Sequence, residues 1–241
     1  MSAFPIAKKL EKCYNREYLL QSFYHFQTKG KDMADKVLEV KGINLPKTEL
    51  GRTKMEKLLR ASEELFATHG FYGTSISDIC KHAGTAVGTF YIYFETKTDV
   101  YKYLMESYKK EIKDRLAESI KNCDSRYTRE REGIKCFIKY AVSAPNIYNI
   151  IWGSLSIDKQ MFVDYYVSFA KSYSRGLESD GELSLTDSES IAYILMGISN
   201  FLGLKAMFNG MTDEEIDKMV DNTVMPALTC GILKQHNNVK E

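Results

Sequence analysis

Residues 74–98, TSISDICKHAGTAVGTFYIYFETKT, combine hydroxyl-bearing and aromatic side chains with two short helical patterns. Ser75 is a candidate N-cap, and Asp78 stands three residues later, at the place of the acidic partner in a capping box. Apolar residues then recur at helical spacing up to Gly84, a residue type that suits the left-handed end of a helix. A second amphipathic helix begins within three residues. Two short helices about a tight turn are typical of a helix-turn-helix, whose second helix can enter the major groove of DNA.

The positions at the start of each helix and on the outer face of the second helix predict the residues that touch DNA. The expected contacts to the bases and the groove come from Thr85, Val87, Gly88, Thr89, Tyr91 and Tyr93, and those to phosphates from Ser75, Ser77 and Lys97. Among them, Val87 and Thr89 have the side chains best suited to base edges or thymine methyl groups. An ordinary helical hairpin in an all-α protein is the alternative, and the spacing alone does not exclude it.

The same residues resemble a known family. The string GFYGTSISDICKHAGTAVGTFYIYFETKTDVY is similar to the DNA-binding segment of the TetR family of transcriptional regulators, and RTKMEKLLRASEELFATHG fits that family's first helix. The resemblance covers residues 52–104. One departure follows the turn glycine, where the family usually has a Val-Ser pair whose serine caps the second helix. This chain has Thr85 and Ala86 there, and we expect Thr85 to take over the cap.

Composition and charge limit the classes of function. The chain has 241 residues, a net charge of +1 and 44% hydrophobic residues, which indicates a globular protein with a substantial core. Residues 52–99 carry six basic and six acidic side chains, which argues against strong non-specific DNA affinity, because that affinity scales with the phosphates neutralised. Specific binding stays open, because helix N-termini bind phosphate without a formal charge and a symmetric dimer doubles the footprint.

Other sequence features point away from an enzyme and away from a secreted protein. The four histidines fall on different expected elements, and we find no nucleophile, P-loop or dinucleotide motif. The sequence therefore predicts no catalytic residues, no cofactor and no metal site. The five cysteines form no C-x-x-C pair, and neither a signal peptide nor a membrane-spanning helix is expected, so a cytoplasmic location is predicted.

The chain is expected to contain three segments. Residues 1–51 form an N-terminal extension of unassigned role, residues 52–98 form the DNA-binding domain, and residues 99–241 form a helical domain for effector binding and dimerisation. The extension carries nine basic and six acidic residues. It is either a loosely docked arm or an extra element that contacts DNA or a second subunit. The whole chain is predicted to be all-α, with roughly nine or ten helices.

The helix expected at 191–208 is apolar almost all round and must be buried on several faces. One arrangement packs it against its own chain on one side and a second subunit on the other, and Gly197, Gly203 and Ala206 would allow close approach. The alternative is the central helix of a monomer. The second half also resembles, more loosely, the branch of the TetR family that includes regulators of fatty-acid metabolism. In that family the C-terminal helices form a ligand pocket and a dimer face.

Aromatic and methionine side chains of the second half are candidates for an apolar effector pocket. They are Tyr108, Phe137, Tyr140, Trp152, Tyr166, Phe169, Tyr173, Met196 and Phe201. Plain core packing is the alternative for each. Lys139, Lys159 or Lys171 could meet a charged head group at the pocket mouth. The sequence and the resemblance thus predict a homodimeric transcriptional repressor that binds operator DNA and is released by a small apolar effector such as a fatty acid or acyl-CoA. The alternative is an architectural or division-control DNA-binding protein without an effector.

Overall fold

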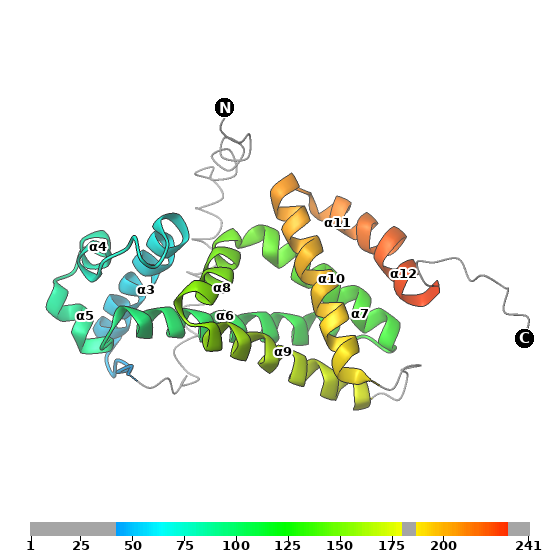
Figure 1. Cartoon of the computed structure of the whole chain (residues 1–241), viewed down its shortest axis with the longest axis horizontal. Helices are drawn as coiled ribbons and strands as arrows, with labels where there is room; N and C mark the ends of the chain where they lie inside the picture. Colours follow the sequence, from blue (N-terminus) through cyan, green and yellow to red (C-terminus); the bar gives the residue numbers. More distant parts are fainter. Residues whose placement is uncertain (1–41, 180–186, 231–241) are drawn as a thin grey trace, which may run out of the picture. The chain divides into compact units, whose positions relative to one another are not determined.

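The structure is a computed structural model that describes residues 42–179 and 187–230. Within these residues the chain forms ten α-helices and one π-helical turn, and its extended pairing is limited to a bridge between Ile43 and Phe94. The predicted all-α architecture is confirmed (Figure 1). The chain divides into two compact units, of which unit 1 comprises residues 1–113 and 143–173 and unit 2 comprises residues 114–142 and 174–241.

Three helices at the start of unit 1 form the helix-turn-helix region. They are α3 (Glu49–His69), α4 (Ile76–His82) and α5 (Val87–Tyr93), and α3 packs against both of the others (Figure 1). Helix α3 begins three residues earlier than the family resemblance suggests, because the Thr48 hydroxyl accepts a hydrogen bond from Gly51 N and caps it. It ends at Gly70, which has a φ of 72° and donates its amide to Phe66 O.

The short helices α4 and α5 owe their stability to caps and to a shared apolar core. The predicted capping box is present, with Ser75 accepting from Asp78 N and the Asp78 carboxylate accepting from Ser75 N. Gly84 has the predicted left-handed conformation, with a φ of 64°. Isolated seven-residue helices are unstable in water, so packing must hold them. Leu58, Ile79, Phe90 and Phe94 supply that packing and are all fully buried.

Three longer helices complete unit 1, namely α8 (Pro145–Ile157) and the parts of α6 (Lys97–Ile120) and α9 (Lys159–Ser179) that precede unit 2. Helix α8 starts with Pro145 at its first position, where the missing N–H costs nothing. Three hydrogen bonds hold α8 against its surroundings. Tyr101 Oη donates to Ile150 O over 2.5 Å, Asn149 Nδ2 donates to Ala67 O, and Tyr72 Oη donates to Ser156 O.

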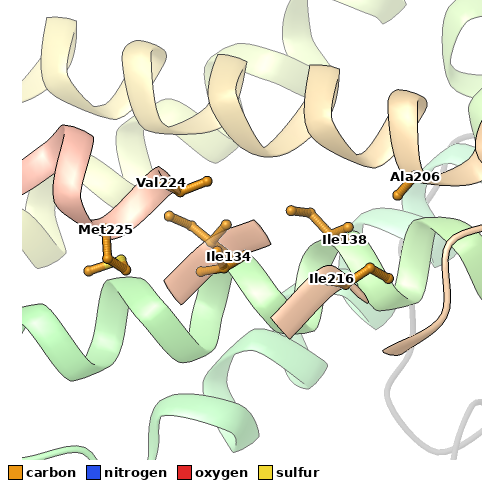
Figure 2. Packing of buried hydrophobic residues seen from close by; sticks show 7 residues of the cluster. Ile134, Ile138, Ala206, Ile216, Val224 and Met225 are labelled. Atoms are coloured by element: carbon orange, nitrogen blue, oxygen red, sulfur yellow. The ribbon is translucent and has the colours of Figure 1, made fainter. Parts of the chain in front are cut away.

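Unit 2 is built around α7 (Arg126–Ser143). Figure 2 shows Ile134 and Ile138 of α7 between Ala206 of α10 (Ser188–Asn209) and side chains of the last helical stretch. That stretch consists of α11 (Asp213–Met219), the π-turn η1 (Val220–Val224) and α12 (Met225–Cys230). All seven side chains of this cluster are at most 5% exposed, so they form the core of the unit.

The last helical stretch contains the π-turn η1, which directly precedes Met225 and Pro226. Proline has no amide hydrogen, and its ring clashes with the carbonyl four residues earlier in a regular helix. The wider turn relieves this conflict, because Met225 N donates to Val220 O, five residues back. Within the turn, the Asp221 carboxylate accepts from Arg131 Nε and Nη2, each over 2.7 Å, and from Lys135 Nζ over 2.9 Å. The hydrogen bonds from Arg131 lower the pKa of Asp221 to about 2.

The face of α10 that is buried differs from the one expected from the sequence. Gly203 and Ala206 are buried inside unit 2, so these small residues approach their own chain rather than an outer surface. The outer face instead carries Ile194, Phe201 and Phe208, which are 58%, 66% and 46% exposed. By length and composition alone, this helix is also apolar enough to cross a membrane, whereas no such helix was expected from the sequence.

The compact units do not follow the three expected segments. Helix α8 packs against α3, so part of the region beyond residue 98 belongs to the same unit as the helix-turn-helix. Residues 1–41 of the extension lie outside the described residues, while residues 42–51 belong to unit 1. The boundary at residue 98 therefore stays a functional prediction.

Candidate nucleic-acid interface and effector site

Helix α5 presents two opposite faces. Phe90 is fully buried and packs against Phe94 at 5.5 Å between ring centroids, which fixes the helix to the core. On the outer face, Val87 is 44% and Tyr91 is 54% exposed, and Gly88 is also exposed. Thr89 is half-buried between them. The structure thus brings four of the predicted contacts onto one helix, from which they can reach another molecule.

The predicted contacts on α4 are also on the surface. Ser75 and Ser77 are both exposed at the start of this helix. The Ser75 hydroxyl is already engaged, because it donates to Asp78 Oδ2 over 2.5 Å and accepts from Asp78 N. These bonds to Ser75 lower the pKa of the Asp78 carboxyl. Ser75 therefore fixes the start of α4, and Ser77 is the serine with the less committed hydroxyl.

Thr85 does not cap α5, and this expectation was wrong. The N-cap is Ala86, which offers no side-chain hydrogen bond. Thr85 instead stays in the turn, where its amide donates to Cys80 O over 2.9 Å. Helix α5 therefore begins one residue later than it would if Thr85 were its N-cap. Thr85 is half-buried and has a role in shaping the turn as well as a place near the expected interface.

Tyr93 and Lys97 are committed to the protein itself. Tyr93 is 5% exposed, so its ring positions α5, and contact with a base through that ring is blocked. The Lys97 ammonium donates to Phe71 O and Thr74 O, both over 2.6 Å, and lies 4.1 Å from the Phe71 ring centroid. Burial lowers the pKa of Lys97. An ammonium has three donors, so two bonds leave one for a phosphate.

Replacing Lys97 by Ala tests whether this third donor reaches DNA. The change should weaken binding to all sequences alike and lower the slope of log affinity against log salt by about one. It should also lower the free energy of unfolding by about 1–2 kcal/mol, because two carbonyl groups lose a charged partner. Lys159→Ala, at an exposed lysine on α9, is the control. If the slope of log affinity against log salt is unchanged while stability falls, Lys97 has a structural role and does not contact phosphate.

A half-buried carboxyl lies where α3, α6 and α8 meet. Glu63 of α3 has the side chains of Tyr108 and Asn146 beside it, and Glu64 and Glu111 are the nearby acidic groups. Burial is the main cause that raises the pKa of Glu63 to about 7, and the two neighbouring carboxylates add to it. Glu63 is therefore largely protonated below neutral pH in the folded protein. The sequence did not indicate this raised pKa, because Glu63 stands next to Glu64 in a helix like any pair of surface glutamates.

The raised pKa of Glu63 makes stability depend on pH. The unfolded glutamate loses its proton near pH 4.5 and the folded one near pH 7, so stability falls as pH rises between these values. Glu63→Gln should abolish this decline and stabilise the protein at pH 8 by about 2 kcal/mol, since the residue keeps some exposed surface. Urea unfolding at several pH values measures the effect, with the exposed Glu118→Gln as control. An unchanged pH dependence in Glu63→Gln would contradict the assignment.

The nine candidate pocket residues are divided between the two units. Tyr108, Trp152, Tyr166, Phe169 and Tyr173 belong to unit 1, and Phe137, Tyr140, Met196 and Phe201 belong to unit 2. In unit 1, Trp152 bonds the Tyr166 hydroxyl, and Tyr165 lies 5.0 Å from the Phe169 ring and 5.3 Å from the Tyr166 ring. In unit 2, Tyr140 is buried against Arg115 and Phe201 is largely exposed.

Lys113 is a candidate that the sequence reading missed. Its ammonium lies 5.2 Å from the Phe169 ring centroid and within 3.2 Å of the hydroxyls of Ser168 and Ser172. Lys139, by contrast, forms an ion pair with Asp217 over 2.8 Å, so it is not available as a head-group partner in the expected way. A lysine one helix away from an aromatic cluster leaves no local sequence signal, because only packing brings them together.

Comparison with known proteins supports the interpretation of the helix-turn-helix. Residues 58–104 match the family described as bacterial regulatory proteins, tetR family. The chain is 44% identical over 63 residues to the uncharacterised HTH-type transcriptional regulator YvdT of Bacillus subtilis (strain 168), and 34% identical over 70 residues to the fatty acid metabolism regulator protein of the same organism. These matches cover 26% and 29% of this chain and only 31% and 36% of the relatives.

A solved structure extends the similarity over most of the chain. A proposed TetR-family transcriptional regulator from Syntrophomonas wolfei str. Goettingen superposes with a TM-score of 0.64 at 27% identity. The superposition covers 76% of this chain and 98% of that one, so it includes helices beyond the helix-turn-helix. The motif residues, the helical architecture and these matches agree that residues 58–104 form the N-terminal, helix-turn-helix region characteristic of the tetR family of bacterial regulatory proteins.

Proposed function

We propose that this protein is a homodimeric transcriptional regulator that binds operator DNA through α5, the recognition helix, and is released by a small apolar molecule. The observation that carries the proposal is the outer face of α5, where Val87, Gly88 and Tyr91 are exposed on a helix fixed by a buried Phe90. The partner proposed for this exposed face of α5 is operator DNA, and the proposed location is the cytoplasm. The relatives that share the motif are named as regulators, and catalysis forms no part of the proposal.

The proposed DNA contacts fall into two groups. Val87, Gly88, Thr89 and Tyr91 lie against the bases and the groove walls, while Ser77 and the remaining donor of Lys97 meet phosphates. Thr85 and Ser75 shape the helix ends from which these contacts are made. Because the domain has balanced charge, specific contacts must supply most of the affinity.

The outer stripe of α10 supports the dimer. Ile194, Phe201 and Phe208 are spaced seven residues apart, so they lie on one face two turns from each other. All three are exposed in the single chain, and Tyr193 beside them is 42% exposed. A large exposed apolar stripe on a soluble monomer is unusual and marks an interaction site. A second copy would cover it with the same stripe related by two-fold symmetry.

The effector is proposed to be a long-chain acyl compound. The aromatic side chains around Trp152 and Tyr166 supply apolar surface, and Lys113 supplies a cation next to them for a carboxylate. One relative is named a fatty acid metabolism regulator, which makes this class the first to test. Binding releases DNA only if the ligand prefers a state in which the two recognition helices fit the operator poorly.

Titration of the effector classes tests the sensor proposal. Trp152 is the sole tryptophan and is 43% exposed, so its fluorescence reports on the cluster directly. Free fatty acids, acyl-CoA esters and hydrophobic aromatic drugs should be added to the protein bound to a duplex selected from a random-sequence pool. One class should change the emission and release the duplex over the same concentration range. If only a polar sugar or a metal ion does so, the apolar effector is wrong.

Lys113→Gln sharpens the same experiment. The variant should bind a free fatty acid about tenfold more weakly, because it loses a charge-assisted hydrogen bond, and the methyl ester of that acid with unchanged affinity. Equal losses for acid and ester would place the head group elsewhere.

The second candidate function is a DNA-binding protein that responds to no effector. It requires that none of the three apolar classes releases the duplex.

A further inference from the structure

We infer that the outer face of α5 reads the 5-methyl groups of thymines in the major groove, and that Ile92 is a specificity-determining residue on that face. The inference rests on the proposed DNA-binding function and adds to it the class of base that the recognition helix selects. Three observations carry it, namely the exposure of Ile92, the side chains that share its face, and the residue types that α5 lacks.

Ile92 is an exposed apolar side chain near the end of α5. It is 59% exposed, which is more than Val87 at 44% and Tyr91 at 54%. The two residues that follow it lie on the core side, because Tyr93 is 5% exposed and Phe94 is fully buried. Ile92 therefore points away from the core, in the same way as the contacts already proposed on this helix.

Two rows of residues form the outer face of α5. Residues four apart lie one above the other on a helix, so Tyr91 follows Val87 in one row. Ile92 follows Gly88 in the adjacent row. Among the described residues, a Cβ at Gly88 would meet no atom from beyond its own helical turn within 4 Å. The backbone at Gly88 can therefore come close to a base, with apolar side chains beside it.

The side chains of α5 cannot make the paired hydrogen bonds by which proteins usually read guanine or adenine. Those pairs come from arginine, lysine, asparagine or glutamine, and cytosine is read by aspartate or glutamate. Residues 83–94, AGTAVGTFYIYF, contain none of these residue types. Thr89 and Tyr91 each offer a single hydroxyl, and Thr89 is half-buried. Direct reading by α5 must therefore depend largely on apolar contact.

The 5-methyl group of thymine is the feature of the major groove that apolar side chains complement. The other bases present hydrogen-bonding groups there, and contact with an apolar side chain would leave those groups without a partner. Because Val87 and Ile92 lie in adjacent rows, each can meet the methyl group of a different thymine. The half-site beneath α5 is therefore expected to contain thymines whose methyl groups face the helix.

Deoxyuridine substitution in the selected duplex tests the inference, because uracil pairs with adenine as thymine does and lacks only the methyl group. Each thymine is replaced in turn, at the same position of both half-sites, and fluorescence anisotropy measures the affinity of the full-length protein. Replacing a contacted thymine should weaken binding about fourfold for each methyl group, or about fifteenfold for the symmetric pair. Thymines outside the half-sites are the control and should show no loss.

Ile92→Ala connects one methyl group to one residue. At the thymine that Ile92 meets, the change to uracil should weaken binding by the wild type but hardly affect the variant, because the contact is already absent. Val87→Ala should remove the loss at a different thymine. Leu155→Ala is the matched control, since Leu155 lies on α8 in the same unit and is 51% exposed. This control should keep the loss at every thymine.

The outcomes separate the reading of thymine from DNA binding itself. Wild-type protein that binds the thymine and uracil duplexes equally overturns the inference, while the proposed function stands. Losses that persist undiminished at every thymine in both Ile92→Ala and Val87→Ala place the methyl contacts outside α5 and also overturn it. Wild-type protein that selects no duplex contradicts the proposed function, on which the inference rests.

Discussion

Replacing Val87 by Asp is expected to lower affinity for the selected duplex at least about a hundredfold while leaving the protein folded. Val87 is the first residue of α5 and is 44% exposed, so the carboxylate would point at the DNA without disturbing the core. A carboxylate there faces phosphates and base acceptors, and two copies in a dimer would repel the duplex at both half-sites. Because acidic residues stabilise the first turn of a helix, the free energy of unfolding should hold or rise slightly.

A matched valine provides the control for this experiment. Val163 lies on α9, in the same unit, and is 37% exposed. Val163→Asp introduces the same charge at a helical surface position away from α5, and affinity for the duplex should stay close to that of the wild type. Anisotropy and urea unfolding are measured on both variants. If Val87→Asp binds the duplex as tightly as Val163→Asp, α5 is not the recognition helix.

Replacing Phe201 by Glu is expected to convert the dimer to monomers. Phe201 is the middle residue of the exposed stripe on α10 and is 66% exposed in the single chain, so the change should leave unit 2 folded. In a dimer the same residue would be desolvated, and an unpaired charge buried in an apolar interface is costly. Affinity for a two-half-site duplex should fall by about a hundredfold, because each subunit would bind its half-site alone.

Sedimentation velocity of the Phe201→Glu variant measures the change, and Tyr127→Glu is the control. Tyr127 lies on α7 of the same unit and is 46% exposed, so it is another aromatic surface residue away from the stripe. It should remain dimeric. A Phe201→Glu protein that sediments as a folded dimer would place the interface on another helix. Gly203→Glu, the change suggested by sequence, is unsuitable because Gly203 is buried inside the chain.

Local features of the helix-turn-helix could be predicted from the sequence because their causes lie within a few residues. The capping box of Ser75 and Asp78, the end of α3 at Gly70 and the left-handed Gly84 depend on the chain's own next turn. These elements were predicted correctly. The cap of α5 was not, because the Thr85 amide bonds Cys80 O back across the turn and Ala86 takes the N-cap position.

Features that depend on packing were beyond the sequence. Lys97 looks like a free cation, but its ammonium meets carbonyl groups 23 and 26 residues earlier in the chain. Tyr93 has the same aromatic character as Tyr91, but packing leaves Tyr93 5% exposed and Tyr91 54% exposed. The same holds for Glu63, whose pKa is raised by helices that are remote in sequence. The apolar pattern of α10 predicted burial on several faces, but in the single chain Ile194, Phe201 and Phe208 stay exposed, and only the structure shows which face they share.

The central claim is that α5 reads a DNA sequence, and selection from a random-sequence duplex pool tests it most directly. Duplexes retained by the full-length wild-type protein would be sequenced after several rounds, alongside those retained by Val87→Asp. The account predicts an inverted repeat enriched by the wild type, with half-sites spaced by whole helical turns, and no enriched sequence with Val87→Asp. A wild-type pool that stays random, or an identical repeat enriched by both proteins, would contradict it.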